Sequence, residues 1–380
     1  MIYLDNAATT KVIPESAQGV SYAMTEAFGN PSSLHGMGVE AERLISFSRR
    51  QILSAIGVAS GSSDYDVIFT SGATEANNTA IFGIASEYGK RKRRIVTTAV
   101  EHPSVEEAFC RLGKLGYEVV TVFPDESGQI SAQALIDAVN ENTCLVSAML
   151  VNNETGYILP VASAFEAIKR RYPDCITHSD CVQGFEKIKF SARKLCADII
   201  TLSGHKIHAP KGIGALCIKK GIRLSPLIYG GGQQNGLRSG TEPVPLIYGM
   251  GKAVSALTPT IAERYAHVSE INDYARSRIE SIGHIISRQD ASPYILSIAL
   301  PGFKSETLLH FLEARQIYVS SGSACSKGKK SSVLEAFRVG EKYIDSVLRL
   351  SFSCETAKSD IDALVQALKE AVGTLAGIKN

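Results

Sequence analysis

The chain has 380 residues, enough for a sizeable core and for two domains. A 44% hydrophobic and 21% charged composition is typical of globular proteins, and a net charge of +2 gives no reason to expect direct binding of nucleic acid. No apolar run approaches the roughly 20 residues that span a bilayer, and MIYLDNAATTK lacks a secretory h-region, so we expect no membrane segment and a cytoplasmic location.

Seven short apolar runs alternate with helical patterns, such as 73–89 and 161–172, over the first two thirds of the chain. This alternation predicts an α/β fold with a mostly parallel sheet covered on both faces. From about residue 251 the pattern changes to a long amphipathic helix and a smaller strand–helix set that ends in a helix over 360–372, which indicates a second domain. The predicted strands lie in 66–72, 94–102, 117–123, 144–153, 175–180, 198–204 and 214–220.

In such sheets the ligand usually lies beyond the carboxyl ends of the strands. The stretch FTSGATEANN, residues 69–78, predicts a strand, a tight turn and a helix start, where the amides near Ala73 and the Thr74 hydroxyl can bind an anion. It lacks the lysine of a Walker loop, and alone it could equally be a capping box that uses Glu75.

His102 follows the next strand, and Pro103 suits the start of a helix. An imidazole there can stack on a flat ring and move a proton, although a lone histidine is more often structural. The basic run KRKRR, residues 90–94, has no interleaved aromatics and is interpreted as a solvated connector.

Asp180 and Lys206 end two later strands. A buried Asp180 needs a cationic partner, such as the ring nitrogen of pyridoxal phosphate, or else it is an ordinary helix N-cap. Lys206 lies in SGHKIHAPKG, residues 203–212, and a partly desolvated lysine there can form Schiff bases. Taken alone, it could equally be an ordinary solvated lysine. No carboxylate or thiol completes a ligand set around His205 and His208, so we expect no metal.

Eight cysteines occur without any Cys-x-x-Cys pair, which excludes a zinc ribbon and a dithiol redox motif. Cys144 and Cys217 lie in apolar runs and should be buried. Cys325 instead lies in SSGSACSKGKK, residues 320–330, among small residues and lysines. It is either incidental to a linker or a reactive thiol that must move.

Ten motifs in this order resemble the cysteine desulfurases, a family of class V aminotransferase-like pyridoxal phosphate enzymes. They are YLDNAATT, GNPSSLHGMG, FTSGATEANN, VEHPSV, VNNETG, HSDCVQG, SGHKIHAPKGIGAL, GGGQQNGLRSGT, SSGSACS and RLSFS. The resemblance implies pyridoxal phosphate transferase fold type I and a homodimer. It implies a large cofactor domain over 16–250 and a smaller α+β domain formed by 1–15 and 251–380.

The resemblance also implies roles around the cofactor, pyridoxal 5'-phosphate. Lys206 should carry its covalent link and remove the substrate α-proton, Asp180 should pair with the ring nitrogen, and His102 should stack on the ring. Residues expected to bind ring substituents or phosphate are Gln183, Asn153, Ala73, Thr74, Ser203, His205 and, from the other subunit, Thr241.

The implied reaction converts L-cysteine to L-alanine. Arg349 should clamp the substrate carboxylate in a pocket lined by Asn6, Ala7 and Asn153, and Cys325 should attack the substrate sulfur and hold a persulfide. A sulfur-acceptor protein for iron–sulfur clusters, thio-cofactors or thio-RNA would then receive the sulfur. The alternatives are selenocysteine lyase, another class V aminotransferase-type reaction, and a non-catalytic scaffold that binds a partner.

The chain departs from the family's pattern in two places. Cys354 stands where relatives often have a second arginine, and SKGKKSSVLEAFRVG carries lysines and lacks a proline after the Cys325 motif. Lys327, Lys329 and Lys330 should lower the thiol pKa modestly from about 8.5, or otherwise dock an acidic acceptor.

Overall fold

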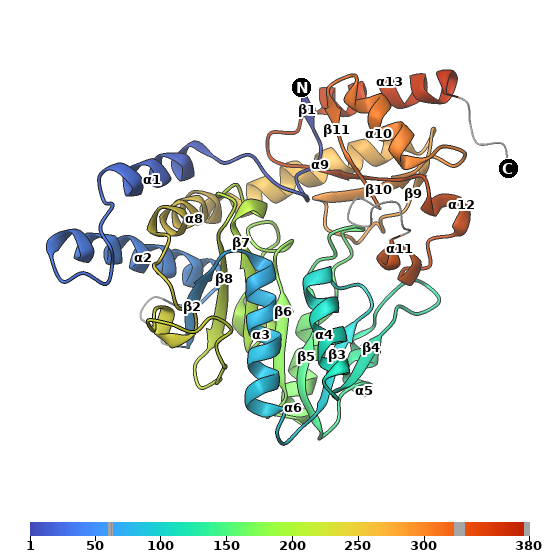
Figure 1. Ribbon diagram of the computed structural model, residues 1–380. Coiled ribbons are helices and arrows are strands. Elements are labelled where there is room, and N and C mark those ends of the chain that lie inside the picture. The colour runs from blue at the N-terminus through green and yellow to red at the C-terminus, as the bar shows by residue number, and fades with distance from the viewer. Residues whose placement is uncertain (60–61, 63, 323–330, 376–380) are drawn as a thin grey trace.

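The computed structural model describes residues 1–59, 62, 64–322 and 331–375. A seven-stranded sheet forms the centre of its lower part and a four-stranded sheet the centre of its upper part (Figure 1).

The seven-stranded sheet has the order β2-β8-β7-β6-β5-β3-β4. Only β8 runs antiparallel to its neighbours, so the prediction of a mostly parallel sheet is confirmed. Each predicted apolar run overlaps one strand, and Cys144 and Cys217 are buried as expected. The strands are β2 (Tyr65–Thr70), β3 (Arg94–Thr98), β4 (Glu118–Val122), β5 (Thr143–Ser147), β6 (Ile176–Asp180), β7 (Ile199–Ser203) and β8 (Gly214–Lys219).

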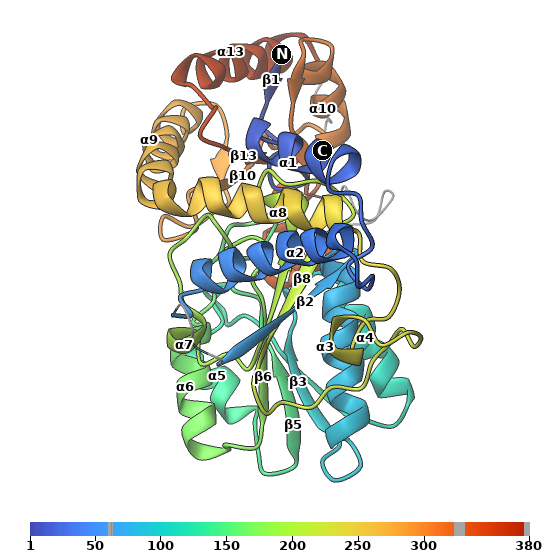
Figure 2. The same cartoon turned by 90° about the vertical axis from the view of Figure 1, so that its left-hand side faces the viewer.

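Helices cover both faces of this sheet because each presents an apolar stripe to it. Ile81, Ile84 and Phe109 pack from α3 and α4 onto one face, while Ile45, Phe165 and Met250 pack on the other. Figure 2 shows α2 and α8 side by side over that second face. The helices are α1 (Pro14–Thr25), α2 (Gly36–Ala55), α3 (Ala73–Tyr88), α4 (Pro103–Lys114), α5 (Ala132–Asp137), α6 (Val161–Arg171), α7 (Ala192–Leu195) and α8 (Val244–Leu257).

The upper part contains the antiparallel sheet β12-β13-β10-β9 and a two-stranded β1-β11 pair. Its helices pack on these strands through a separate apolar core that includes Leu296, Leu350 and Leu368. Its elements are β1 (Ile2–Tyr3), α9 (Ile261–Ile279), β9 (His284–Ile285), β10 (Ile295–Ala299), α10 (Ser305–Glu313), β11 (Ile317–Tyr318), β12 (Ser320–Ser321), α11 (Ser332–Ala336), α12 (Glu341–Ile344), β13 (Val347–Ser351) and α13 (Lys358–Thr374).

The long helix predicted from about residue 251 is present as α9, but it begins at Ile261. Two helices, α8 and α9, are separated by the 3-10 turn Thr258–Thr260. Pro259 in this turn has no backbone N–H and cannot continue the hydrogen-bond ladder of α8. The predicted helix over 360–372 is confirmed as α13.

The N-terminal segment connects the two sheets. Leu4 N donates to Tyr318 O (2.8 Å), and Ser351 N donates to Leu4 O (2.7 Å), which fixes the segment to the upper part. A few residues later, Thr10 N donates to His205 O (2.9 Å) beyond the end of β7 in the large sheet. Among the described residues, no helix is both long enough and apolar enough to cross a membrane.

Candidate active site

Lys206 lies in a short 3-10 helix, Gly204–Lys206, directly after β7. Its ammonium donates to the carbonyl oxygens of Ala7 (2.6 Å) and Ala8 (2.7 Å). The Gln183 amide, in the turn after β6, donates Nε2–H to the same Ala7 oxygen (2.9 Å). Three predicted site residues are therefore joined through one carbonyl of the N-terminal segment.

Asp180 ends β6 and is almost completely buried. Its carboxylate accepts hydrogen bonds from Val182 N (3.0 Å) and from Asn77 Nδ2 (2.8 Å) on α3. No helix begins here, so Asp180 is not a helix N-cap. One carboxylate with two N–H donors is fixed in position and keeps lone pairs for a cationic partner.

His102 caps the N-terminus of α4, where Pro103 is the first helical residue, as predicted. Its Nδ1 accepts from Ser104 N (3.1 Å) and lies 2.8 Å from Ser104 Oγ. Burial lowers the pKa of His102, Asp180 opposes this shift, and Lys206 adds to it. The ring is therefore predominantly neutral at pH 7, which favours stacking and proton transfer.

The start of α3 lies beside β8 and forms the candidate anion site. Gly214 approaches Gly72 so closely that a Cβ on Gly214 would lie 2.7 Å from the Gly72 carbonyl carbon, and only glycine fits. Glu75 accepts from Ser71 N (2.8 Å), which holds the turn before the helix, but the N-cap is Gly72 and no side chain caps the helix, so the predicted alternative of a capping box is wrong. The helix N-terminus at Ala73 and Thr74 can still offer amides to an anion.

The residues around this helix start fit a phosphate group. The Ser203 hydroxyl is buried without a hydrogen-bond partner among the described residues, and such a group needs one. Burial, followed by the neighbouring Lys206, lowers the pKa of His205 to about 4, so its ring is neutral and can bind by hydrogen bonding. These observations are compatible with the phosphate of pyridoxal phosphate.

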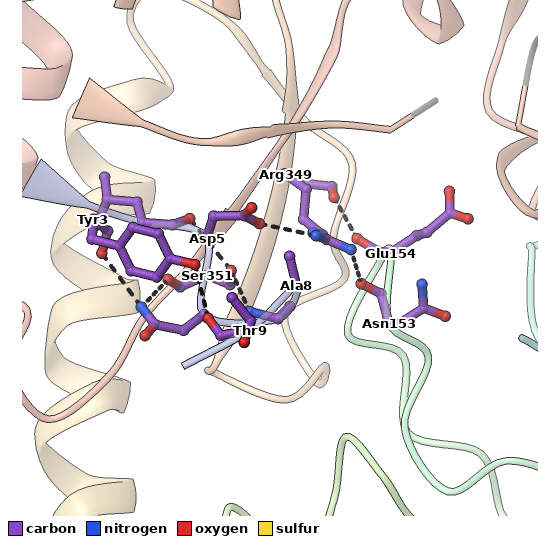
Figure 3. A network of polar contacts seen from close by, with 12 residues as sticks. Tyr3, Asp5, Ala8, Thr9, Asn153, Glu154, Arg349 and Ser351 are labelled. Atoms are coloured by element: carbon purple, nitrogen blue, oxygen red, sulfur yellow. Dashed lines mark hydrogen bonds and ion pairs between the residues drawn. The ribbon is translucent and has the colours of Figure 1, made fainter. Parts of the chain in front are cut away.

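Arg349 lies in β13 and is the central residue of the network in Figure 3. Its Nη2 donates to Asp5 Oδ1 (3.0 Å) and its Nη1 to Asn153 O (3.0 Å), while Nε is buried without a partner among the described residues. Asn6 and Ala7 bind the neighbouring Ser351, through Asn6 Nδ2 to its carbonyl (2.9 Å) and Ala7 N to its Oγ (2.8 Å). A guanidinium so placed can bind a carboxylate from a ligand.

Several predicted residues are not joined to this group. Thr241 is exposed, and no hydrogen bond among the described residues links it to the others. Cys325 and the lysines 327, 329 and 330 lie outside the described residues. Cys354 is exposed at the edge of a cavity of about 10 Å³ that Lys206 and Asn6 also line.

Comparison with known proteins gives matches over nearly the whole chain. The model of the class V aminotransferase family matches residues 2–364. A NifS/IcsS protein homolog from Lactobacillus delbrueckii subsp. bulgaricus is 40% identical, covering 97% of each chain. A cysteine desulfurase IscS from Methanosarcina thermophila is 34% identical over 98% of this chain and 92% of its own length. The chain belongs to the cysteine desulfurase family. Its fold agrees, since a solved NifS-like protein superposes with a TM-score of 0.92 at 34% identity, covering 98% of this chain and 100% of that one.

This desulfurase also contains site residues that the sequence reasoning missed. Asn77 Nδ2 bonds both Asp180 and Ser104 Oγ (2.9 Å), and so connects the β6 end to the His102 turn. An asparagine on the otherwise apolar face of α3, one turn from Ala73 and Ile81, was the available signal.

Lys187 is the second missed residue of the desulfurase. It is buried, and its ammonium donates to Gln183 Oε1 (2.7 Å). Burial lowers its pKa to about 7, and the positive charges of Lys206, Arg349 and Arg264 add to this shift. Because Lys187 occupies the Gln183 oxygen, the amide must present its N–H side toward Ala7.

Proposed function

We infer that the protein is a cysteine desulfurase that uses pyridoxal 5'-phosphate, converts L-cysteine to L-alanine and holds the removed sulfur as a persulfide on Cys325. The observation that carries this inference is the meeting of a lysine, a buried glutamine and a buried arginine around one N-terminal segment. Lys206 and Gln183 share the Ala7 carbonyl, and Arg349 binds Asp5 two residues earlier.

The cofactor would be held from three sides. Its phosphate fits the α3 start at Ala73 and Thr74 together with Ser203 and His205, and Thr241 of a second subunit would complete this cradle. When bound, the cofactor supplies an electron sink that stabilises negative charge at the substrate α-carbon.

The remaining contacts orient its ring. Asp180 would pair with the ring nitrogen, because it is buried and already fixed by Asn77. His102 would lie on the ring face, while Gln183 and Asn153 would bind ring substituents.

The chain's own residues would then perform the reaction. Arg349 binds the carboxylate of L-cysteine in the pocket lined by Asn6, Ala7 and Asn153, and Lys206 takes the α-proton. The Cys325 thiolate attacks the substrate sulfur, so an S–S bond forms as the Cβ–S bond breaks. The electron pair of the broken bond stays on the carbon skeleton. Its Cβ gains the proton that the Cys325 thiol gave up, its α-carbon regains a proton from Lys206, and the product leaves as alanine. The balance is L-cysteine plus thiol giving L-alanine plus persulfide.

We also propose a homodimer, a cytoplasmic location and transfer of the sulfur to an acceptor protein for iron–sulfur cluster, thio-cofactor or thio-RNA synthesis. The predicted domain division at residue 250 falls inside α8, whose Met250 and Val254 belong to the core of the large sheet. We therefore propose that the large domain extends to the end of α8.

The test is the Cys325→Ala variant, assayed for alanine formed from L-cysteine. We expect loss of turnover with the visible cofactor band retained, whereas Lys206→Ala should lose that band. Undiminished alanine formation by Cys325→Ala would contradict the persulfide route and favour selenocysteine lyase or another class V reaction. Absence of any lysine-dependent chromophore would favour the non-catalytic scaffold.

A further inference from the structure

Glu154 and Ser331 form a hydrogen bond between segments 177 positions apart. Ser331 Oγ donates to Glu154 Oε2 at 2.6 Å. The same oxygen accepts from Leu334 N (3.1 Å), because Ser331 is the N-cap of α11. The Ser331 hydroxyl thus ties the start of α11 to Glu154 and caps the helix at once.

This contact is partly buried. Ser331 is only 7% exposed, and burial raises the pKa of Glu154 to about 7 against the opposing effects of the Ser331 bond and the Arg349 charge. A partly buried hydrogen bond to a carboxyl group holds its partner more firmly than a fully solvated one, since loss of either member leaves a polar atom that water reaches poorly.

The backbone of Glu154 belongs to the substrate side of the site. Its carbonyl accepts from Ser297 Oγ (2.5 Å) on β10, and the preceding carbonyl, of Asn153, accepts from Arg349 Nη1 (3.0 Å). Figure 3 shows the Glu154 carboxylate pointing away from Arg349. The backbone of Glu154 therefore lies on the Arg349 side, while its side chain binds Ser331 at the start of α11.

Resting on the proposed function, we propose that Glu154 is a positioning residue for sulfur transfer. It fixes the start of α11, and so one end of the segment that carries Cys325, at a set place relative to Arg349. Six positions separate Cys325 from Ser331, a span of at most about 20 Å. With Ser331 anchored, this chain length limits how far Cys325 can lie from the start of α11, which raises the effective concentration of its thiol at the substrate that Arg349 holds.

The test uses the holoenzyme in single turnover. Persulfide on Cys325 is followed by mass spectrometry after quenching, and L-cysteine binding by the change in cofactor absorption. We expect Glu154→Ala and Ser331→Ala each to slow persulfide formation about tenfold while the Kd for L-cysteine changes less than about twofold. Glu154→Gln and Ser331→Thr keep an acceptor and a hydroxyl, and are the matched controls that should stay within about threefold of the wild type.

The double variant Glu154→Ala/Ser331→Ala should be no slower than the slower single variant, because both remove the same bond. The proposal would be overturned if the two single-variant effects on the persulfide rate multiplied in the double variant. It would also be overturned if Ser331→Ala left that rate unchanged, or if Ser331→Thr did not keep it near the wild-type value. Should Glu154→Ala not fold, as judged by circular dichroism, the Ser331 pair decides alone. Failure of the proposed function is distinguishable, because then Cys325→Ala itself would keep full turnover.

Discussion

At the scale of single residues, two buried carboxyl groups beside the site are held differently. Asp180 receives N–H donors on both oxygens. Glu101, which precedes His102, accepts from Thr98 Oγ1 (2.6 Å) and Met149 N (2.9 Å) on one oxygen only, and the other is buried without a partner among the described residues. Burial raises the pKa of Glu101 to about 8, so Glu101 is mostly protonated at pH 7.

This predicts a pH-dependent difference in stability between Glu101→Gln and the wild type. The folded pKa of about 8 lies above the unfolded value near 4.5, so the stability that the protonated group contributes is full below pH 4.5 and is lost as pH rises toward 8. Glutamine does not ionise. From pH 5 to pH 8, the free energy of unfolding of Glu101→Gln should therefore rise relative to wild type by on the order of 3 kcal/mol.

Urea unfolding at several pH values measures this difference. Glu106→Gln, an exposed change in the first turn of α4, is the control and should follow the wild-type profile. Parallel profiles for Glu101→Gln and the wild type would show that Glu101 is already ionised in the folded protein.

Arg349 gives a second prediction at this scale. Arg349→Lys keeps the charge but loses the planar fork that binds a carboxylate through two N–H groups. The KM for L-cysteine should rise about 10- to 100-fold, with a smaller effect on kcat. Steady-state alanine formation measures both, and an unchanged KM would assign the substrate carboxylate to another residue.

At the scale of elements, the turn after β6 connects the site to α9. Glu186 has a left-handed backbone (φ 57°), which is uncommon for a residue with a side chain. Arg264 of α9 donates both to its carbonyl (2.7 Å) and to its carboxylate (3.2 Å), and so holds this conformation. Arg264 of α9, which lies outside the large sheet, therefore also holds the turn that carries Lys187 and Gln183.

Lys187→Met tests what this turn contributes. Methionine fills the same buried space without a donor, so Gln183 should lose its orientation and the holoenzyme should release cofactor about tenfold faster. Release is followed by loss of visible absorbance in the presence of a cofactor trap. In a Gln183→Ala background, Lys187→Met should add little to the rate of cofactor release. The exposed control Lys189→Met should leave that rate unchanged. Additive effects of Lys187→Met and Gln183→Ala would show that Lys187 does not act through Gln183.

The sequence predicted elements more fully than it predicted contacts. The strands of the large sheet are apolar runs that, apart from the half-exposed edge strand β4, are mostly buried, and polar residues at their ends marked Asp180 and Lys206. Asn77 and Lys187 were missed because only their burial in the folded protein distinguishes them from ordinary polar residues. The hydrogen-bond partner of Asn77, Asp180, lies 103 positions away in the sequence. The break between α8 and α9 had a local signal in Pro259, which the helical periodicity on both sides concealed.

At the scale of the whole molecule, exposed apolar side chains mark a surface where the second copy of the proposed homodimer would bind. Phe28 (68% exposed) and Leu34 (100%) lie between α1 and α2, and Tyr229 (78%) lies at the start of the loop that ends with Thr241. The ion pair Arg49–Glu242 (3.9 Å) brings α2 close to the end of that loop. A dimer formed here would bury these side chains and place Thr241 near its partner's site.

Phe28→Glu/Tyr229→Glu should therefore be monomeric in sedimentation at micromolar concentration, where the wild type should have twice the monomer mass. The variant should also retain cofactor less well, because Thr241 would no longer reach a second subunit. Leu115→Glu changes an exposed leucine at the end of α4 and should remain dimeric. A dimeric Phe28→Glu/Tyr229→Glu protein would exclude this surface.

The N-terminal segment has a mechanical consequence. Residues 4–10 are bonded to β11 and β13 at one end and to His205 at the other, with the Ala7 carbonyl between them on Lys206. A force that separates the two sheets would act on this strip of backbone together with the hydrogen bonds Ser297–Glu154 and Arg264–Glu186, which also join the two parts. Pulled from residue 1 in a single-molecule experiment, the protein should lose its lysine contacts at an early, small extension, while both sheets are still intact.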